Sequence, residues 1–304
     1  MILRAFFIAL SRSNVLKKFF THSKLAQRAS KRFIAGLTIE DAIPAVKVLN
    51  ENGITATMDF LGENVETEAE AKEAADEVIR ILNAQAEAGI EGNVSIKLTQ
   101  MGFDLGDEFC TSNIERIIAR AKELKSFVRI DMEGSDCTQR TLDIFYNLRS
   151  RYDNVGIVIQ SYLYRSEEDI RQIISRGGVV RLCKGAYREP KTVAFQKKSD
   201  SDANFVKLTK LLLDSGLYHG IATHDEKMIQ ATIDYVREKK IDVNTFEFQM
   251  LYGIRRDLQK KLVEDGYRMR VYVPYGHQWY PYFMRRLAER PANLIFLLKN
   301  IIRP

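Results

Sequence analysis

The chain has 304 residues, of which 45% are hydrophobic and 28% charged, a balance typical of globular proteins. Its net charge of +6 would suit a nucleic-acid-binding protein, but the charge is unevenly distributed. Residues 1–39 carry a net charge of +8, residues 40–253 carry −9 and residues 254–304 carry +7. Nucleic-acid binding needs basic residues spread across one surface. An acidic middle between two basic ends disfavours that class, and we predict no nucleic-acid partner.

The three cysteines, Cys110, Cys137 and Cys183, are far apart and form neither a CxxC pair nor a zinc-binding pattern. A sparse, odd number of cysteines is typical of a reducing compartment. The four histidines form no metal cluster, so no metal site is predicted. The apolar run over residues 5–10 is too short for a signal peptide, and no stretch of about 20 apolar residues is present. We therefore expect a cytoplasmic protein.

Eight short apolar and β-branched runs, separated by amphipathic helical patterns, follow the basic leader. The runs cover residues 54–62, 93–99, 127–133, 155–163, 179–187, 220–225, 245–251 and 269–276. The helical patterns cover residues 66–89, 113–124, 141–152, 167–178, 202–216 and 226–240. Successive runs begin about 31 residues apart, which is the length of a βα unit.

Eight βα units in one chain predict an α/β fold, a TIM-type (β/α)8 barrel over residues 40–304. A basic helical arm over residues 1–39 precedes it, and an extra helix follows the last strand. The alternative is an open doubly wound sheet, which the number of strands disfavours.

Polar residues stand towards the carboxyl ends of most predicted strands, although barrel strands are expected to be apolar. These residues are Lys97, Asp131, Gln160, Arg181, Lys184, Thr223, His224 and Gln249. Each alone could be satisfied within the core, for example Lys97 in an ion pair with Asp131. Six strands with the same feature at the same end instead predict a polar mouth at the rim where barrel enzymes place their chemistry.

The extra helix is predicted over residues 279–290, directly after the eighth strand. Tyr282, Arg285, Arg286 and Glu289 are spaced at i, i+3, i+4 and i+7, so they share one face. Two adjacent guanidinium groups can clamp a small carboxylate or a phosphate. The alternative is a solvent-exposed charged face stabilised by i,i+4 pairs.

Generic catalytic motifs are absent from the sequence, which has no GxSxG, P-loop, HExxH or strand-following GxGxxG. Lys184 at the end of the fifth strand could form a Schiff base, as in a barrel aldolase. That alternative leaves the arginine-bearing helix unexplained.

Together these residues resemble the proline dehydrogenase family, in its short monofunctional bacterial form. The helix signature YxxRRxxE is met by Tyr282, Arg285, Arg286 and Glu289, and a motif similar to RLxKGAY begins at Arg181. Further matches follow in order along the chain at Lys97, Asp131, Gln160, Thr223, His224, Gln249, Leu251 and Tyr272. The resemblance spans roughly residues 30–300.

The resemblance implies FAD-dependent oxidation of L-proline to Δ1-pyrroline-5-carboxylate, with hydride transfer from ring carbon C5 to flavin N5. A barrel that holds FAD would also account for the missing GxGxxG motif. Arg285 and Arg286 would bind the proline carboxylate, and Glu289 would hold an arginine in place. The ring would be enclosed by Lys97, paired with Asp131, and by Tyr187, Leu251, Tyr272 and Tyr282. The cofactor would contact Gln160, Arg181, Cys183, Lys184, Gly185, Ala186, Thr223, His224 and Gln249, with Arg181 near N5.

The resemblance also implies two partners, a quinone electron acceptor and a separate pyrroline-5-carboxylate dehydrogenase, because no second catalytic domain is expected here. Tyr272 stands where hydroxyproline-using relatives carry a smaller residue, which favours proline. The leader combines apolar residues with Lys and Arg and contains no acid. It could lie on the inner face of the cell membrane, or it could pack on the barrel as helices.

Overall fold

Eight parallel strands close into a barrel in a computed structural model that describes residue 30, residues 32–62 and residues 65–289. The strands are β1 (Ile54–Phe60), β2 (Gly92–Ile96), β3 (Val128–Ile130), β4 (Val155–Gln160), β5 (Val179–Cys183), β6 (His219–Ala222), β7 (Phe246–Leu251) and β8 (Met269–Tyr275). Each strand pairs with its neighbours in sequence, and β8 closes the barrel on β1 from Ile54↔Met269 to Phe60↔Tyr275. The predicted (β/α)8 barrel is confirmed, and the open sheet is wrong.

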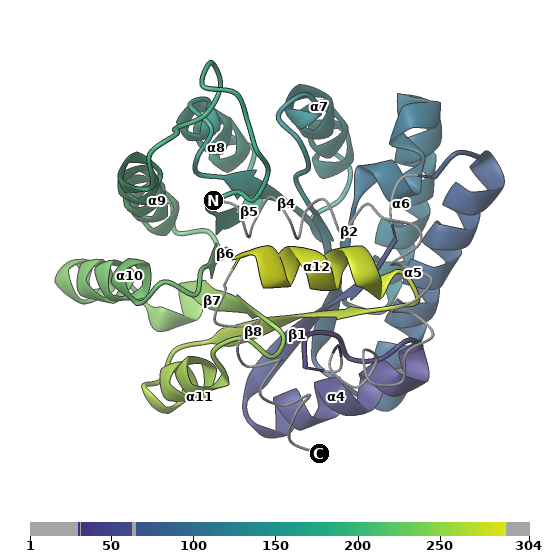
Figure 1. The fold of residues 1–304 in the computed structure, drawn as a ribbon, viewed down its shortest axis with the longest axis horizontal. Coiled ribbons are helices and arrows are strands. Elements are labelled where there is room, and N and C mark those ends of the chain that lie inside the picture. The colour runs from purple at the N-terminus through teal and green to yellow at the C-terminus, as the bar shows by residue number, and fades with distance from the viewer. Residues whose placement is uncertain (1–29, 31, 63–64, 290–304) are drawn as a thin grey trace.

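Helices surround the strands, and Figure 1 shows α12 crossing in front of them. The helices are α4 (Ile39–Glu51), α5 (Glu68–Ala88), α6 (Asp107–Glu123), α7 (Thr138–Arg149), α8 (Ser166–Ser175), α9 (Lys198–Leu213), α10 (Glu226–Lys239), α11 (Arg256–Glu264) and α12 (Trp279–Glu289). Short 3-10 turns are η1 (Leu98–Met101), η2 (Phe103–Leu105) and η3 (Val243–Thr245). The six predicted connecting helices and the extra helix are all present. Most of the predicted arm, residues 1–39, lies outside the described residues.

Local sequence signals explain where the longest helix begins and ends. At the start of α5, the Thr67 side chain accepts a hydrogen bond from the Glu70 N–H, and the Glu70 carboxylate accepts one from the Thr67 N–H. This capping box satisfies two backbone donors that the helix leaves free. Gly89 ends the helix in the left-handed conformation (φ 62°), which costs glycine little.

The interior of the barrel is polar along its length, not only at the carboxyl ends of the strands. On β1, Thr57 and Asp59 alternate with Ala56 and Met58, and all four are buried. Ala56 and Met58 belong to the main apolar core, whereas Thr57 and Asp59 bond to side chains of other strands inside the barrel. The expectation of strands apolar on both faces is therefore wrong for this barrel. The apolar core lies between the strands and the outer helices.

The N-terminal half of α12 is held at the carboxyl end of the barrel by a second apolar cluster. Trp279 and Phe283 pack there with Phe33 and with Leu61, which follows β1. Leu251, the last residue of β7, contacts the same cluster. The helix therefore begins against the rim at which the strands end, as the sequence predicts.

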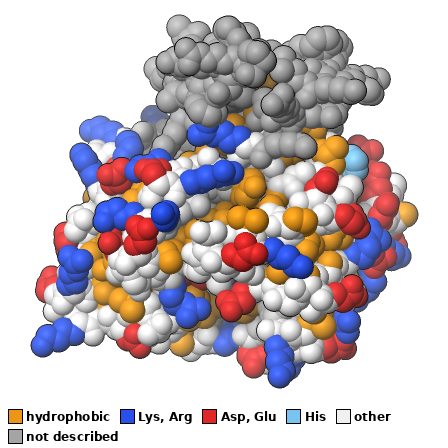
Figure 2. All heavy atoms as spheres, turned by 90° about the horizontal axis from the view of Figure 1, so that it is seen from below, with side chains coloured by type: hydrophobic (Ala, Val, Ile, Leu, Met, Phe, Trp, Pro, Cys, Tyr) orange, Lys and Arg blue, Asp and Glu red, His pale blue; other side chains and the backbone are white. Residues whose placement is uncertain are grey.

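The face shown in Figure 2 carries Lys and Arg side chains interspersed with Asp and Glu over the part of the chain that is described. None of the described helices combines the length and apolar composition that crossing a bilayer requires.

Candidate active site

A pocket of about 510 Å³ lies at the carboxyl ends of the strands. Fourteen of the eighteen residues predicted from the sequence line it: Lys97, Asp131, Gln160, Arg181, Cys183, Lys184, Gly185, Ala186, Tyr187, Thr223, His224, Gln249, Leu251 and Tyr272. They come from strands β2 to β8 and from the residues directly after them. The fold thus brings together in one pocket side chains that are up to 175 positions apart in the sequence.

The remaining four predicted residues lie on α12. Tyr282 is buried in the apolar cluster of that helix, with Phe33 and Phe283, and the described lining of the pocket does not include it. The backbone of α12 continues to Glu289. The side chains of Arg285, Arg286 and Glu289 lie outside the described residues, so the arginine clamp stays a prediction.

Arg181 occupies the centre of the barrel, 6% exposed, and its guanidinium makes four hydrogen bonds. Nε donates to Gln249 Oε1 at 2.5 Å, and Nη1 donates to Asp131 Oδ1 at 2.9 Å and to Ser95 Oγ at 3.0 Å. Nη2 donates to Thr57 Oγ1 at 3.4 Å. A guanidinium has five N–H groups, so these contacts fix its plane and leave one donor for a ligand in the pocket.

Tyr272 completes this group from β8. Its hydroxyl donates to Asp131 Oδ2 at 2.8 Å, and the Arg181 guanidinium carbon lies 5.2 Å from the centre of its ring. Burial, followed by the carboxylate of Asp131, raises the pKa of Tyr272 well above its usual value. The phenol is therefore a neutral hydrogen-bond donor that forms a stiff wall of the pocket.

Lys97 pairs with Asp59, which corrects the predicted pair with Asp131. The Lys97 Nζ lies 2.8 Å from Asp59 Oδ1 and 3.0 Å from Oδ2. Asp131 is instead bound by Arg181, Tyr272 and Ser95. Burial lowers the pKa of Lys97, but nearby carboxylates outweigh burial and raise it to about 12. The pocket therefore contains a fixed ammonium group at the end of β2.

Lys184 lies in a four-charge network on the opposite side of the pocket. Its Nζ is 2.5 Å from Asp202 Oδ1 and 2.8 Å from Asp225 Oδ2, and Lys198 contacts the same two carboxylates. Burial raises the pKa of Asp225, but the hydrogen bonds from the two lysines outweigh it and bring it to about 2. An ammonium held by two carboxylates is part of a structural ion-pair network, whereas a Schiff-base lysine must react as the free amine, which argues against the Schiff-base alternative.

Three features of the lining suit a planar ligand with its own hydrogen-bonding groups. Gly185 has φ +104°, and a Cβ there would lie 2.3 Å from the Tyr162 ring, so only glycine fits. The Nε2 of Gln160 donates to backbone carbonyls, while its buried Oε1 has no partner among the described residues. His224 Nε2 accepts from the Leu251 N–H at 2.9 Å, so the proton of the neutral ring is on Nδ1.

Sequence reasoning missed several polar residues of the site. Glu133 and Asp225 line the pocket, two residues after Asp131 in the segment RIDME and directly after His224 in the segment ATHD. The Glu133 carboxylate accepts hydrogen bonds from the Thr99 N–H at 3.1 Å and the Thr99 hydroxyl at 2.7 Å. Asp59 could have been noticed as the one charged residue within an otherwise uncharged strand, ITATMDF.

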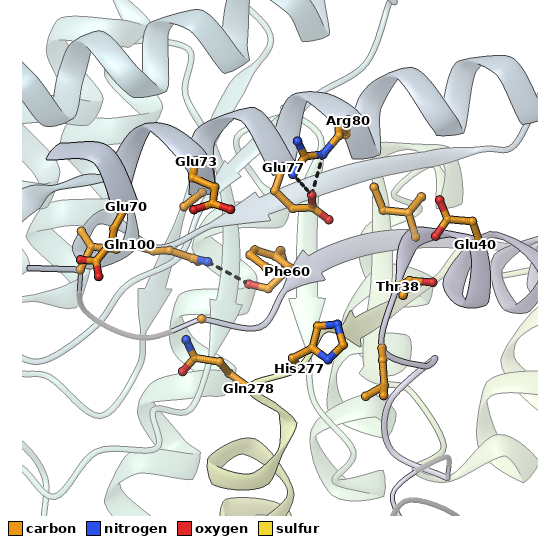
Figure 3. A pocket seen from close by; sticks show the side chains of 15 residues that line it. Thr38, Glu40, Phe60, Glu70, Glu73, Glu77, Arg80, Gln100, His277 and Gln278 are labelled. Atoms are coloured by element: carbon orange, nitrogen blue, oxygen red, sulfur yellow. Dashed lines mark hydrogen bonds and ion pairs between the residues drawn. The ribbon is translucent and has the colours of Figure 1, made fainter. Parts of the chain in front are cut away.

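A second pocket of about 560 Å³ lies beside the start of α12, between the end of β1 and α5 (Figure 3). Four carboxylates line it, but two of them have structural partners. Glu70 belongs to the capping box of α5, and Glu77 accepts a hydrogen bond from the Tyr275 hydroxyl at 2.8 Å and pairs with Arg80. We assign no ligand to this pocket.

Comparison with known proteins places the whole chain in one family. Residues 42–299 match the family model described as proline dehydrogenase. Proline dehydrogenase 1 of Bacillus subtilis strain 168 is 45% identical over 302 residues, covering 99% of this chain and 100% of its own. A proline dehydrogenase of Deinococcus radiodurans is 44% identical and covers 90% of each chain.

A solved structure is also similar, that of proline utilization A from Bdellovibrio bacteriovorus inactivated by N-propargylglycine. It superimposes with a TM-score of 0.82 at 28% identity and covers 87% of this chain and 33% of its own. The family model covers most of the barrel, and the relatives match the chain almost from end to end. The chain is therefore an enzyme that belongs to the proline dehydrogenase family.

Proposed function

We propose that the enzyme oxidises L-proline to Δ1-pyrroline-5-carboxylate with FAD as its cofactor. The observation that carries the proposal is one pocket at the carboxyl ends of the strands, in which fourteen residues with predicted roles meet. A polar, partly charged centre beside apolar and aromatic walls suits a small zwitterionic ring stacked on a planar cofactor. The full-length similarity to proline dehydrogenases supports the choice of substrate.

The residues that would hold FAD are those on the β4, β5, β6 and β7 side of the pocket. Gln160 offers an unsatisfied acceptor for a ring N–H, Arg181 offers a remaining donor, and Gly185 lets the backbone approach closely. Lys184, whose charge is balanced by Asp202 and Asp225, would contact the cofactor from the end of β5, as the family resemblance implies. When bound, FAD would supply the acceptor for the hydride and the electrons that leave C5 of the proline ring.

The other side of the pocket would bind proline. Tyr272 and Leu251 would enclose the ring and exclude water, while Arg285 and Arg286 on α12 would fix the carboxylate. A substrate held in this orientation has already lost its translational and rotational entropy on binding, so the chemical step no longer has to supply that cost. A positive charge at Arg181 would stabilise the negative charge that develops on the cofactor side. Lys97, held by Asp59, would form part of the wall around the proline ring.

The product and the electrons need further partners. Δ1-pyrroline-5-carboxylate opens by hydrolysis to glutamate semialdehyde, which a separate dehydrogenase would oxidise. A quinone would accept the electrons, and the basic leader, residues 1–39, would hold the enzyme on the inner face of the membrane that contains it. Removal of residues 1–30 should then abolish binding to anionic vesicles while flavin reduction by proline is retained. If vesicle binding persists without the leader, the leader is not the anchor.

The test of the main proposal is anaerobic reduction of the bound flavin. Purified protein should be yellow, and L-proline should bleach its visible absorbance. Arg285→Met or Arg286→Met should raise the proline concentration needed for half-bleaching at least about a hundredfold, because each removes a charge-assisted hydrogen bond to a buried carboxylate. Arg171→Met is the matched control, since Arg171 makes an exposed pair with Glu167 on α8.

An absorbance that excess proline leaves unchanged would contradict the substrate assignment. The aldolase alternative predicts a different result. Borohydride would then trap a carbonyl substrate on Lys184 in colourless protein, and Lys184→Met would abolish trapping.

A further inference from the structure

Glu247 lies on β7 two residues before Gln249, in the interior of the barrel and outside the lining of the active-site pocket. It is 2% exposed. Its Oε1 accepts hydrogen bonds from Gln249 Nε2 and from Arg270 Nε, both at 2.6 Å. Its Oε2 accepts one from the Tyr218 hydroxyl at 2.7 Å. The proposed function gives this buried carboxylate no role.

The charge of Glu247 makes it an acceptor only. Burial raises the pKa of Glu247, but Arg270, Tyr218 and Gln249 outweigh burial, so the pKa lies below its usual value. An ionised carboxylate cannot donate a hydrogen bond. It therefore binds the nitrogen of the Gln249 carboxamide and would repel the oxygen.

The other end of the Gln249 carboxamide meets a group that can only donate. Arg181 Nε lies 2.5 Å from Gln249 Oε1, and a guanidinium carries no acceptor. The orientation of an amide follows from its hydrogen-bond partners, and here both partners demand the same orientation. Turning the amide over would place donor against donor at Arg181 and oxygen against oxygen at Glu247.

Space for the amide comes from the neighbouring strand. Gly220 on β6 pairs with Glu247 in the register. A Cβ at Gly220 would lie 2.4 Å from Gln249 Nε2 and 2.8 Å from Gln249 Cδ. The glycine thus leaves room for the side chain that links Glu247 to Arg181.

We propose that Glu247 is a positioning residue for Arg181, acting through the Gln249 carboxamide. Its consequence for the cofactor rests on the proposed function, in which Arg181 lies beside flavin N5. With Gln249 correctly oriented, the Arg181 guanidinium is held by acceptors on four strands. Without Glu247, only Arg181 still orients the Gln249 amide, so the acceptor of the Arg181 Nε is held much less firmly. A less well placed positive charge would stabilise the reduced, anionic flavin less.

The experiment compares three variants with the wild-type holoenzyme. Glu247→Met removes the acceptor and keeps an unbranched side chain. Gly220→Ala displaces Gln249 without changing any charge. Both should weaken the preference of the protein for reduced over oxidised flavin at least tenfold, which lowers the two-electron midpoint potential by about 30 mV. Glu247→Gln, which keeps an oxygen for the Gln249 amide, should stay within about threefold of wild type.

Crystal structures of the flavin-free variants provide a second readout that does not depend on FAD. The contact between Arg181 Nε and Gln249 Oε1 should be lost in Glu247→Met and Gly220→Ala and kept in Glu247→Gln. Its persistence in the first two variants, or an unchanged flavin potential in both, overturns the proposal. If Glu247→Met does not fold, Glu247→Leu takes its place, because Gly220→Ala tests only the link from Gln249 to Arg181. If the wild-type protein does not take up FAD, the proposed function fails, and the crystal structures still decide the positioning role.

Discussion

Lys97 has two carboxylates within reach on the neighbouring strands, Asp59 and Asp131. It pairs with Asp59, although the sequence predicts Asp131. Because Ile96 pairs with Ile130, the next residues along, Lys97 and Asp131, are adjacent across the β2–β3 pair. Asp131 is nevertheless bound by Arg181, which reaches it from β5. Lys97 therefore turns to Asp59 on β1. Arg181, fifty positions after Asp131 in the chain, thus determines which carboxylate pairs with Lys97. This is why the sequence identified Lys97 and Asp131 but neither Asp59 nor the pairing.

Asp59→Asn tests how strongly this pair contributes to stability. It should lower the free energy of unfolding by about 3 kcal/mol, because a largely buried ammonium group loses its counter-charge. Asp76→Asn is the control, since Asp76 pairs with Arg116 on the surface, where both side chains are nearly half exposed. The control should cost less than about 1 kcal/mol. Urea unfolding of both variants gives the comparison, and equal losses would contradict a special role for the buried pair.

Among the secondary-structure elements and their connections, the loop between β5 and α9 contributes four consecutive residues, 184–187, to the lining of the pocket. It begins with Lys184, Gly185 and Ala186, and Glu189 fastens it to the β3–α7 connection. The Glu189 carboxylate accepts from the Ser135 N–H at 2.9 Å and from the Ser135 hydroxyl, while the Tyr162 hydroxyl lies 3.4 Å away. This contact bridges two loops on the rim of the pocket.

Glu189→Gln should loosen that bridge. An amide keeps only one oxygen, which can still accept from the Ser135 N–H, and loses the negative charge and the second acceptor, so we expect a loss of about 1–2 kcal/mol in the free energy of unfolding. The dissociation constant for FAD should rise severalfold, because the loop that carries Gly185 is less well held. Glu168→Gln is the control, an exposed residue of α8 bonded to Gln172. Flavin affinity that stays at the wild-type value in Glu189→Gln would show that the bridge does not support the cofactor site.

The sequence predicted all eight strands, because each contains a short run of apolar and β-branched residues. It did not predict α11, where only Leu258, Gln259 and Leu262 are buried and the other side chains are mostly charged. Two leucines four positions apart are too weak a pattern to identify a helix. The network around Arg181 was equally inaccessible. Its partners are scattered over four strands, and only the closure and register of the barrel bring them together.

At the scale of the whole molecule, the barrel is stabilised by a buried histidine that must stay neutral. His219 is fully buried at the start of β6, where its Nδ1 accepts from the Val180 N–H at 3.0 Å and its Nε2 lies 2.9 Å from Ser215 Oγ. Burial, followed by the charge of Arg129, lowers the pKa of His219 to about 3. The ring is therefore uncharged in the folded protein at any pH near neutrality.

The lowered pKa predicts a pH dependence of stability. Below about pH 6.5 the unfolded chain binds a proton at His219, whereas the folded protein does not. The free energy of unfolding therefore decreases as the pH is lowered from about 6.5 to about 3. The loss from this one residue between about pH 7 and about pH 5 is about 2 kcal/mol. In His219→Asn, whose amide oxygen can still accept from Val180, this part of the slope should disappear. Urea titrations of the wild-type protein and of His219→Asn between about pH 7 and about pH 5 give the comparison, and an unchanged slope in the variant would contradict the role of His219.

The partners of Arg181 become available at different times during synthesis of the chain, so the site around this residue can be completed only late. Its hydrogen-bond partners lie on β1, β2 and β7 and directly after β3, so the guanidinium and its own strand β5 link five of the eight strands. Contacts between such distant segments form only after the intervening chain has closed into the barrel. A nascent chain that ends before β7 lacks the last of these partners. The side chain proposed to face the flavin therefore reaches its final position only late in synthesis, and cofactor uptake should mark the end of folding.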